Sequence, residues 1–518
     1  MQYISRCIFL IVISLSFSCS STRRGNTSKK DDGKFEVIFV QVNDVYEIAA
    51  TSGGKAGGMA RVATVKKENL QLNPNTFLVM AGDFVSPSVY NSLLYQGKRI
   101  RGKQMIEAMN AAGIDLVVFG NHEFDITEPE LQERINESNF QWLASNSFHK
   151  KNGTVSPFEK QVNNNTAAIP QTFILSLTDA DGTKVKIGFI GITMPFNKAE
   201  YVEYTDPLIT AEKMYNLLKD SCDAVVALTH QPIEEDIILA RQLPNLAMIL
   251  GGHEHDERME ITGNVIITKA HSNAKSAYII KLLIEKNKKT HLAVPTLKML
   301  DENVKFDSNT NAVVKKWTDI ATENYASLGF DPRKVIISSG DSLDGRETGV
   351  RSSSTNFTRL ITAAMAEACP ESVISIMNAG SIRVDDILYP PFTQYDILRS
   401  LPFGGPIREA EITGSLLLQI LDVGEKNSGT GGFLHSHPVV FDPTLGNWIL
   451  KGNPIDTGKV YRVAFSDFLI TGREANLGFL NKNNPAMIKL YDAELSPESS
   501  KSDIRLAIVR YLEKLNLE

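Results

Sequence analysis

Short, continuously apolar segments alternate with helical patterns over the first part of the chain. Seven segments rich in Val, Ile, Leu and Phe have the length and composition of strands that are buried on both faces. They cover residues 35–42, 76–82, 115–120, 186–193, 223–230, 246–253 and 264–271. The intervening segments, such as residues 101–113, have the helical period and end in glycine. This alternation predicts an α/β domain, which we place at residues 35–302.

The pattern changes after residue 302. Residues 303–335 include a polar segment with one apolar stripe, which predicts a connecting helix. A second α/β pattern then begins and includes the apolar segments at 373–383, 405–421 and 461–470. A chain of 518 residues is too long for one ordinary core, because single cores stop growing at about 250–300 residues. We therefore predict two α/β domains, residues 35–302 and 336–518, joined by a helical linker.

The amino-terminal residues have the layout of an export signal. Within residues 1–19, one Arg precedes an apolar run from Cys7 to Leu15, and small residues then lead to Cys19. The run is too short to span a bilayer by itself. The residues before Cys19 resemble a bacterial lipoprotein signal, whose cysteine becomes the acylated first residue; simple secretion and a buried core segment are the alternatives. We expect an exported lipoprotein of the cell envelope or periplasm, anchored only through Cys19, with residues 20–34 as a polar tether.

The composition is that of a globular protein and excludes some partners. The chain is 42% hydrophobic and 22% charged, and its formal net charge is −6. A negative net charge gives no general attraction to nucleic acid or to anionic lipid. The sequence also lacks the basic stripe and aromatic ladder typical of a nuclease. We therefore expect no nucleic-acid partner, and an anionic substrate would have to be held by a local group of cationic side chains.

Polar side chains follow five of the predicted strands, at the point where each strand ends. They are Asp44, Asp83, the group Asn121, His122 and Asp125, then His230, and finally His253 and His255. Ligands in open α/β sheets gather outside the carboxyl ends of the strands, because loops from several strands converge there. Taken singly, Asp83 could be a turn residue and His230 a hydrogen-bonded polar residue. His253 and His255, two positions apart in an extended segment, point to the same side, and the joint arrangement predicts a divalent metal site.

The order and spelling of these residues resemble a known signature. Asp, Gly-Asp, Gly-Asn-His-Glu, His and Gly-His-x-His resemble the metallophosphoesterases, and "GNHEFD" with "GGHEHD" resembles the 5′-nucleotidase family of secreted and periplasmic enzymes. The resemblance implies a four-layer α/β/β/α amino-terminal domain with two divalent ions, zinc, manganese or similar. It implies that Asp83 bridges both ions, that Asp44 and His255 hold the first, and that Asn121, His230 and His253 hold the second.

The same resemblance makes His122 and Asp125 the catalytic pair that does not bind metal. Two closely spaced cations can generate a bridging hydroxide at neutral pH and clamp the phosphoryl oxygens during in-line attack. A protonated His122, oriented by Asp125, would then stabilise the charge that develops on the phosphoryl group or on the leaving oxygen.

Tyr46 departs from the family pattern. The family has Asp-x-His where this chain has Asp44, Val45 and Tyr46, and that His is a ligand of the first ion. Tyr46 could ligate as a phenolate, which its ordinary pKa of about 10 opposes unless a strongly Lewis-acidic ion such as Fe(III) is present. It could instead leave the position to water, or the first site could be impaired. We expect water, and therefore a first ion that is bound more loosely than is usual in the family; iron is expected only if Tyr46 is a ligand.

The second domain carries the residues expected to select a substrate. Residues 344–365 resemble the segment that opens the family's carboxyl-terminal domain, "MNAGSIR" resembles its Asn-Gly-Gly-Gly-x-Arg segment, and "SLPFGG" resembles the loop with one aromatic wall of the base slot. The resemblance implies phosphate contacts at Arg346, Arg351 and Arg383, a base contact at Asn378 and stacking at Phe403; we assign the second wall to Phe479. Stacking contributes about 1–3 kcal/mol per base, and guanidinium groups bind phosphate with paired hydrogen bonds.

We expect metal-dependent hydrolysis of nucleoside 5′-monophosphates in a cleft between the two domains. A nucleotide-sugar pyrophosphatase or a cyclic-nucleotide phosphodiesterase would use the same metal centre and differ only in the shape of the slot. A nucleotide-binding surface lipoprotein without catalytic activity is a further alternative if Tyr46 prevents binding of the first ion.

Overall fold

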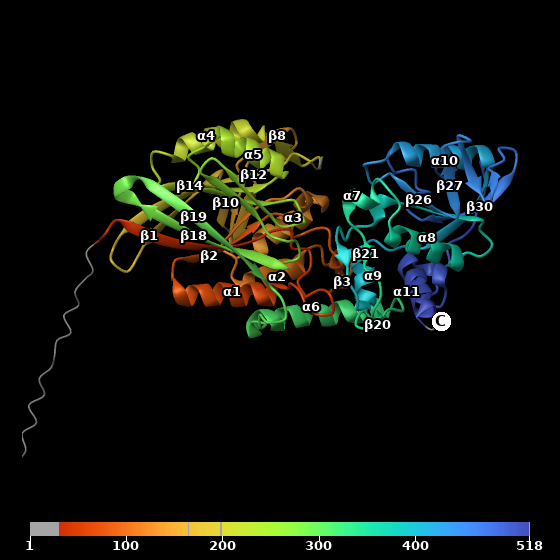
Figure 1. Ribbon diagram of the computed structural model, residues 1–518, viewed down its shortest axis with the longest axis horizontal. Coiled ribbons are helices and arrows are strands. Elements are labelled where there is room, and N and C mark those ends of the chain that lie inside the picture. The colour runs from red at the N-terminus through yellow and green to blue at the C-terminus, as the bar shows by residue number, and fades with distance from the viewer. Residues whose placement is uncertain (1–30, 164, 197–198, 517–518) are drawn as a thin grey trace, which may run out of the picture.

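The computed structural model describes residues 31–163, 165–196 and 199–516, which form two lobes lying side by side (Figure 1). The predicted export signal, with Cys19, and most of the tether lie outside the described residues. Within the described part of the chain, no helix combines the length and the apolar character needed to cross a membrane.

The larger lobe contains two six-stranded sheets. The first has the order β19-β18-β1-β2-β5-β6, with β1 at Lys34–Val42, β2 at Thr76–Ala81, β5 at Leu116–Val118, β6 at Gln141–Leu143, β18 at Ser276–Glu285 and β19 at Thr290–Met299. Strands β1, β2, β5 and β6 are parallel, whereas β18 and β19 form an antiparallel hairpin beside β1. The seven predicted strands of this lobe are all present in its two sheets, with ends that differ by up to two residues from the prediction.

The second sheet also has four parallel strands, but its two antiparallel strands lie on opposite edges. Its order is β11-β12-β14-β15-β17-β16, with β11 at Thr172–Thr178, β12 at Lys184–Thr193, β14 at Ala224–His230, β15 at Met248–Gly252, β16 at Arg258–Thr262 and β17 at Val265–Lys269. The four central strands are parallel, and β11 and β16 are antiparallel edge strands.

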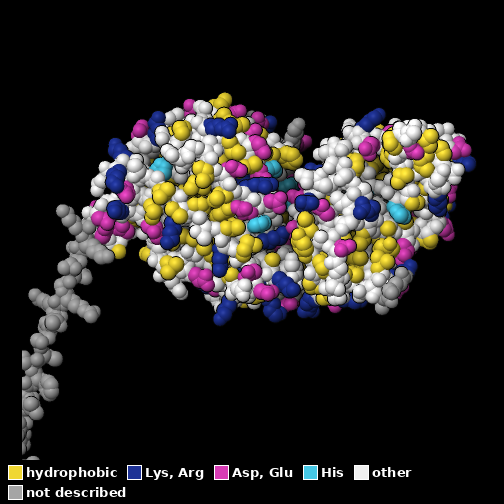
Figure 2. Space-filling view, viewed as in Figure 1, with side chains coloured by type: hydrophobic (Ala, Val, Ile, Leu, Met, Phe, Trp, Pro, Cys, Tyr) yellow, Lys and Arg dark blue, Asp and Glu magenta, His cyan; other side chains and the backbone are white. Residues whose placement is uncertain are grey.

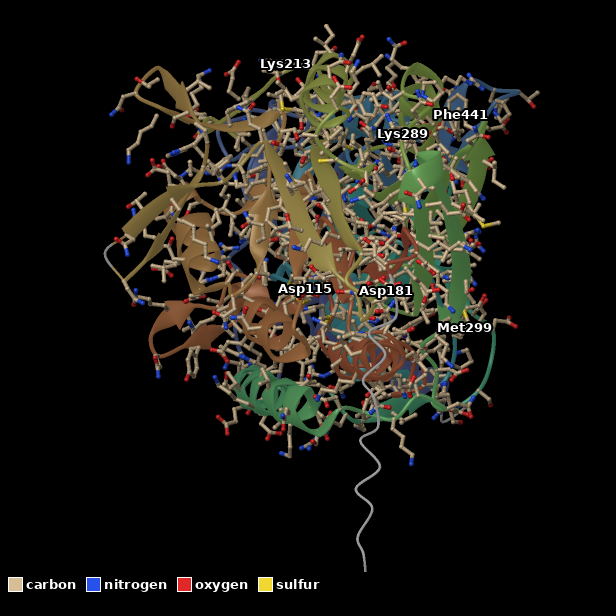
Figure 3. All side chains as sticks on the ribbon, turned by 90° about the vertical axis from the view of Figure 1, so that its left-hand side faces the viewer. Asp115, Asp181, Lys213, Lys289, Met299 and Phe441 are labelled. Atoms are coloured by element: carbon tan, nitrogen blue, oxygen red, sulfur yellow. The ribbon has the colours of Figure 1, made fainter. Side chains whose placement is uncertain are left out.

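The two sheets face each other across an apolar core. Phe39 of β1 and Phe189 of β12 meet with ring centroids 5.7 Å apart, and Val79 and Val226 are buried in the same cluster. Helices α1 (Met59–Leu72), α2 (Lys103–Ala112) and α3 (Glu128–Glu137) cover the first sheet, and α4 (Pro207–Leu218) and α5 (Ile233–Gln242) cover the second. In Figure 3, α4 with Lys213 lies on the opposite side of the sheets from α1. The predicted four-layer α/β/β/α arrangement is confirmed.

The connections of both lobes contain short strands that pair in twos or threes. They are β3 (Leu94–Tyr95) with β4 (Lys98–Arg99), β7 (Ser147–Lys151) with β8 (Thr154–Ser156) and β13 (Val202–Tyr204), β9 (Glu159–Val162) with β10 (Asn165–Ala168), β20 (Val335–Ile337) with β24 (Phe392–Thr393), β21 (Leu343–Asp344) with β23 (Ile387–Leu388), and β27 (Val439–Asp442) with β28 (Asn447–Leu450) and β29 (Asn453–Pro454).

The predicted connecting helix is α6, at Ser308–Ala326. Asp307 caps its first turn by accepting the backbone N–H of Thr310 at 3.0 Å. Trp317 is fully buried, and its indole N–H donates to Oε2 of Glu107 on α2 at 3.0 Å. Helix α6 therefore packs against α1 and α2 of the larger lobe, and its last residues lead into the smaller lobe.

The smaller lobe is built on a five-stranded mixed sheet of order β26-β22-β30-β25-β31. Its strands are β22 (Ile374–Asn378), β25 (Ile407–Thr413), β26 (Leu434–His437), β30 (Val460–Ser466) and β31 (Met487–Leu490). Helix α10 (Gly414–Lys426) packs on one face, and α8 (Asn356–Ala368) and α11 (Ile504–Leu515) pack on the other. The short helices α7 (Glu347–Val350) and α9 (Gln394–Ser400) lie at the seam between the lobes (Figure 1). Both predicted α/β domains are thus present.

The parallel strands of the larger lobe end at this seam (Figure 1). Polar contacts between described residues of the two lobes occur there. The hydroxyl of Tyr395 donates to Glu47, Lys275 pairs with Asp386, and Nδ1 of His255 lies 2.8 Å from Oδ2 of Asp385. The polar strand ends of one lobe are therefore covered by loops of the other.

Candidate metal centre and substrate cleft

The backbone is strained at three of the residues that follow the strands. Asp44, Asp83 and His253 have φ values of 52°, 55° and 92°, in the left-handed region that residues other than glycine seldom adopt. Such a conformation costs about 1–3 kcal/mol and persists only where the surroundings enforce it, which is common at functional sites. The strain indicates that the ends of β1, β2 and β15 belong to a functional site.

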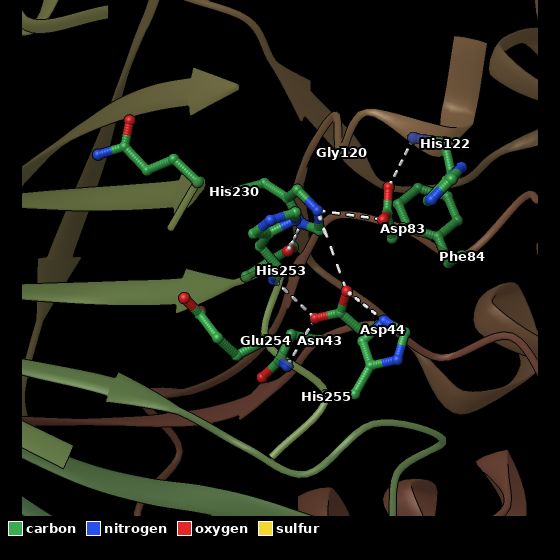
Figure 4. A network of polar contacts seen from close by, with 12 residues as sticks. Asn43, Asp44, Asp83, Phe84, Gly120, His122, His230, His253, Glu254 and His255 are labelled. Carbon is green, nitrogen blue, oxygen red and sulfur yellow. Dashed lines mark hydrogen bonds and ion pairs between the residues drawn. The ribbon is translucent and has the colours of Figure 1, made fainter. Parts of the chain in front are cut away.

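Asp44, Asp83 and His230 bring their polar atoms together at the centre of this site (Figure 4). Nε2 of His230 lies 3.1 Å from Oδ2 of Asp83 and 3.9 Å from Oδ1 of Asp44. All three side chains are almost completely buried. Two carboxylates held this close, away from water, form a strongly negative pocket that favours a cation.

The protonation of His230 follows from its other ring nitrogen. Nδ1 lies 2.8 Å from the carbonyl oxygen of Ala81, which can only accept, so Nδ1 donates there and Nε2 is the nitrogen that faces the pocket. Burial by itself lowers the pKa of His230, but the charges of Asp83 and Asp44 raise it to about 10. Burial likewise acts to raise the pKa of Asp83, but His230 and His122 hold it below its usual value. The carboxylates of Asp83 and Asp44 thus stabilise a positive charge next to them.

Asn121 and His253 extend the donor set on the side of His230. Within residues 31–163, 165–196 and 199–516, no hydrogen-bond partner reaches the buried Oδ1 of Asn121. A buried amide oxygen without a partner is costly unless a cation completes it. Burial and the neighbouring His230 lower the pKa of His253 to about 3, so its imidazole is neutral and able to ligate. The ligand atoms of Asp44, Asp83 and His230 all lie within 4.8 Å of one another, and Asn121 and His253 offer further donor atoms beside them.

His255 lies on the other side of Asp44 from His230 (Figure 4). Its Nε2 is 3.7 Å from Oδ1 of Asp44, and its Nδ1 donates to the Asp385 carboxylate of the smaller lobe. Burial lowers the pKa of His255, but the hydrogen bond and charge of Asp385 raise it to about 9. Because the bond to Asp385 keeps a proton on Nδ1, Nε2 is the nitrogen that faces the pocket. The smaller lobe thus orients a donor of the larger one.

The hydroxyl of Tyr46 lies among these donors. It is 3.1 Å from Oδ2 of Asp83, 3.1 Å from Nε2 of His255 and 3.4 Å from Oδ1 of Asp44. Burial and the charges of Asp83 and Asp44 raise the pKa of the Tyr46 phenol well above its usual value. The sequence predicted the departure from the family pattern but not this position.

His122 and Asp125 form the predicted pair at the entrance of the site. Nδ1 of His122 lies 2.6 Å from Oδ2 of Asp125, and the backbone N–H of His122 donates to Oδ1 of Asp83 at 2.8 Å. Burial opposes the protonated form, but the charges of Asp83 and Asp125 raise the pKa of His122 above its ordinary value. A proton on Nε2 would therefore face the cleft.

Glu123 holds the loops that carry Asp83 and Asn121. Its buried carboxylate accepts the four backbone N–H groups of Asp83, Phe84, Val85 and Gly120 at 2.6–3.0 Å. Burial and the nearby Asp83 raise the pKa of Glu123 to about 7, although these N–H groups act to lower it. The loops also need glycine at Gly120, because a Cβ there would lie 2.0 Å from Oδ1 of Asp83.

A cleft of about 370 Å³ opens next to the donor set and is lined by both lobes. The larger lobe contributes Asp83, Asn121, His122, His253 and His255, and the smaller lobe contributes Arg346, Arg351, Arg383 and Asp385. Arg346 pairs with Asp344 at 2.8 Å, and Arg351 pairs with Glu347. Basic, acidic and imidazole side chains gather along this seam in Figure 2. The cleft therefore places cationic side chains opposite the metal donors.

A second cavity, of about 430 Å³, lies in the smaller lobe and is lined by Phe403, Phe468 and Asn378. Phe403 is 67% exposed and Phe468 is 40% exposed, so both offer aromatic surface to a ligand. Nδ2 of Asn378 donates to Oε2 of Glu474 at 2.7 Å. Phe479, which we assigned to this slot from the sequence, instead packs against the apolar core of the lobe.

The structure therefore brings together the predicted ligands, the His122 and Asp125 pair and the three arginines, whereas Phe479 lies apart from them. Sequence reasoning missed Glu123, Asp385 and Phe468. The "SDF" segment, which begins at the last residue of β30, could have pointed to Phe468, because polar and aromatic site residues follow the ends of the other strands as well.

Two protein families match consecutive parts of the chain. Residues 38–257 match the calcineurin-like phosphoesterases, and residues 335–479 match the 5′-nucleotidase C-terminal domain. A calcineurin-like phosphoesterase domain implies divalent metal ions, in agreement with the donors around Asp83.

Relatives match nearly the whole chain at low identity. The 5′-nucleotidase of Bos taurus is 24% identical over 558 residues, which cover 93% of this chain and 89% of that protein. The trifunctional nucleotide phosphoesterase protein YfkN of Bacillus subtilis is 23% identical over 92% of this chain, which spans only 34% of that longer protein. The crystal structure of the 5′-nucleotidase precursor from Thermus thermophilus has the same fold, with a TM-score of 0.66 and 22% identity over 93% of this chain and 97% of that one.

Replacing Glu123 by Ala is expected to destabilise the protein by about 3 kcal/mol, because four buried N–H groups lose their acceptor. Metal content after dialysis should fall as well, since Asp83 and Asn121 lose their support. Thermal unfolding followed by circular dichroism and elemental analysis would measure both effects. Glu133→Ala, at a half-exposed carboxylate on α3, is the control and should change little. A Glu123 variant as stable as this control would contradict the assigned role.

Proposed function

Because the chain belongs to the 5′-nucleotidase family, with a calcineurin-like phosphoesterase domain followed by a 5′-nucleotidase C-terminal domain, we propose that it hydrolyses nucleoside 5′-monophosphates to nucleoside and phosphate. The observation that carries this proposal is the placement of one loop between the two cavities. Asn378 lines the aromatic cavity, and Arg383, five residues later, lines the cleft beside the metal donors. A molecule with a planar base at one end and a phosphate at the other matches this pair of cavities.

The metal donors would hold two ions that share Asp83. Asp44 and His255 would hold the first, and Asn121, His230 and His253 the second. When bound, such ions supply Lewis acidity at the phosphoryl group and a water-derived nucleophile at neutral pH. The strained loops keep the donors in position before substrate arrives, so little reorganisation is needed at the moment of reaction.

His122 would act as the proton-bearing group of the reaction. Its Nδ1–H donates to Asp125, which fixes the ring and leaves Nε2 directed at the cleft. Neighbouring carboxylates raise the pKa of His122 above its ordinary value, which favours the imidazolium. From there, Nε2–H would donate to the phosphoryl or leaving oxygen as negative charge develops on it.

The arginines would bind the phosphate from the opposite side. Arg346, Arg351 and Arg383 all line the cleft, and a guanidinium group can form paired hydrogen bonds with phosphate oxygens. The arginines and the base-binding residues belong to the smaller lobe and the metal donors to the larger one, so the substrate would contact both lobes at once.

Phe403 and Phe468 would stack on the nucleobase in the aromatic cavity, and Asn378 would contact the nucleobase with its amide.

Residues 1–19 have the pattern of an export signal, and we propose from it that the protein acts outside the cytoplasm, anchored through Cys19. The oligomeric state plays no part in this proposal, since all named residues belong to one chain.

Protein without residues 1–19, stripped of metal and supplied with zinc, manganese or iron, is expected to release phosphate from AMP. His122→Ala should lower kcat by about 10²- to 10⁴-fold, because the proton donor is lost. His149→Ala is a matched control, since His149 also bonds a carboxylate, Glu128, but lies outside the cleft. If no metal restores release from AMP, while a nucleotide sugar or a cyclic nucleotide is cleaved, the same centre serves a diester. An inert but folded protein with all three substrates would favour a binding protein.

Phe468→Ala is expected to raise KM for AMP by about 5- to 150-fold, the equivalent of losing 1–3 kcal/mol of stacking. Turnover of p-nitrophenyl phosphate, which has no nucleobase, should change far less. Phe479→Leu separates the two assignments of the second wall, because Phe479 packs in the core and its loss should leave KM for AMP unchanged. A large rise in KM for the Phe479 variant, with none for the Phe468 variant, would restore the assignment made from the sequence.

A further inference from the structure

We propose that Lys269 is a positioning residue of the metal centre. Its buried ammonium group joins the loop that carries His230 to the loop that carries His253 and His255, and so holds the two loops at a fixed spacing. The inference rests on the proposed metal-dependent function and deepens it, because Lys269 acts through its neighbours and contacts neither the metal donors nor the substrate cleft.

Lys269 is the last residue of β17, and its side chain is completely buried. A lysine is almost never fully buried unless it is paired, because moving a charge out of water is costly. Its Nζ lies 2.9 Å from Oδ2 of Asp236, and it donates to the carbonyl oxygen of Gln231 at 2.6 Å and to Oε2 of Glu254 at 2.5 Å. Two carboxylates and one carbonyl oxygen therefore compensate this ammonium group.

One of these contacts leads to the loop of His230. This donor is the last residue of β14, and the carbonyl oxygen that accepts from Lys269 belongs to the next residue, Gln231. The side-chain amide of Gln231 also donates to Oδ1 of Asp236 at 2.9 Å. Both the backbone and the side chain of Gln231 are thus held in place, directly beside His230.

Another contact leads to the histidine pair. Glu254 lies between His253 and His255 in the sequence, and Figure 4 shows its side chain directed away from Asp44. While Oε2 of Glu254 accepts from the lysine, its Oε1 accepts the backbone N–H of Ile233, at the start of α5, at 2.6 Å. The carboxylate of Glu254 is therefore held at both oxygens, and it anchors the segment that carries the two histidines.

The strand before the histidine pair leaves room for the lysine. Gly251 lies two residues before His253, and a Cβ at this glycine would lie 2.8 Å from Cε of Lys269 and 3.0 Å from Oδ2 of Asp236. Contacts this short would force the closely packed side chains to shift. Glycine at this position therefore lets β15 lie directly against the pair of Lys269 and Asp236.

Stability alone does not account for a lysine at this place. Replacing a buried ion pair by apolar side chains of similar volume is often neutral or stabilising, because the desolvation of the charges offsets their attraction. Groups that orient metal ligands, in contrast, typically change metal affinity by about 10- to 100-fold. The contacts of Lys269 with both donor loops therefore favour a positioning role.

The test measures zinc binding to the purified, metal-free protein by competition with a chromophoric chelator, in the absence of substrate. Lys269→Met removes the ammonium group but keeps an unbranched side chain. We expect this variant to bind zinc about 10- to 100-fold more weakly than the wild type, because the two loops lose their common partner. Glu254→Ala, at a side chain that is 19% exposed, should weaken zinc binding within the same range, and it keeps the test decisive if Lys269→Met fails to fold.

A double variant and a control separate positioning from stability. In a protein that already carries Glu254→Ala, adding Lys269→Met should weaken zinc binding by less than about threefold, because the link to the histidine pair is already lost. Lys66→Met removes a comparable ion pair, with Asp115 at 2.7 Å, which directly precedes β5 at the opposite edge of the first sheet. This control should lower the unfolding temperature but keep zinc affinity within about twofold of the wild type.

Several results would overturn the inference. They are wild-type protein that binds no zinc, unchanged zinc affinity in both single variants, an equal loss of affinity in Lys66→Met, and losses in the double variant that simply multiply.

Phosphate release from AMP, measured on the same samples, separates this inference from the proposed function. Because Lys269 does not contact the substrate, kcat and KM of Lys269→Met should lie within about threefold of the wild type once zinc is saturating. The expected zinc affinities without AMP hydrolysis in any sample would keep the role of Lys269 and reject the nucleotidase. AMP hydrolysis with unchanged zinc affinity in both single variants would keep the nucleotidase and reject the role of Lys269.

Discussion

Two carboxylates, Asp44 and Asp83, are buried together at the strand ends of the larger lobe, and uncompensated charge in such a place is costly. Much of the surrounding structure provides the compensation. His230 donates through Nδ1 to Ala81 and turns Nε2 to the carboxylates, and the backbone N–H of His122 donates to Asp83. Glu123 holds the loops of Asp83 and Gly120 by accepting their backbone N–H groups. The negative charge of Asp44 and Asp83 therefore accounts for the imidazole and N–H groups that surround these carboxylates.

The smaller lobe has two roles at the site of the buried carboxylates. Its arginines face the cleft, where they add positive charge opposite the metal donors, and its Asp385 orients His255 of the other lobe. Asp385 itself has a left-handed backbone, with φ of 37°, so the loop that begins at Asn378 is shaped to reach across the seam. The substrate cleft and the orientation of His255 thus depend on the same loop.

The sequence was sufficient where a local pattern determines the structure. Buried apolar runs such as residues 223–230 predict β14 closely, and a polar residue after each strand, such as His230, predicts a site because parallel strands end on one side. It was insufficient where the outcome depends on packing between distant segments. Phe468 and Phe479 are both aromatic residues near the end of β30, and only the packing of the loop decides which one faces the cavity. Asp385 gives no local signal, because its partner His255 belongs to the other lobe.

The central claim is that one nucleotide is bound across both lobes, with its phosphate at Asp83 and its base at Phe403. The most direct measurement is a crystal structure of the zinc-loaded protein with a phosphonate analogue of AMP, with the metal ions located by anomalous scattering. The account predicts metal at the shared Asp83, the phosphonate between that metal and Arg383, and adenine between Phe403 and Phe468. A phosphonate bound away from Asp83, or adenine outside the aromatic cavity while the phosphonate occupies the cleft, would contradict it.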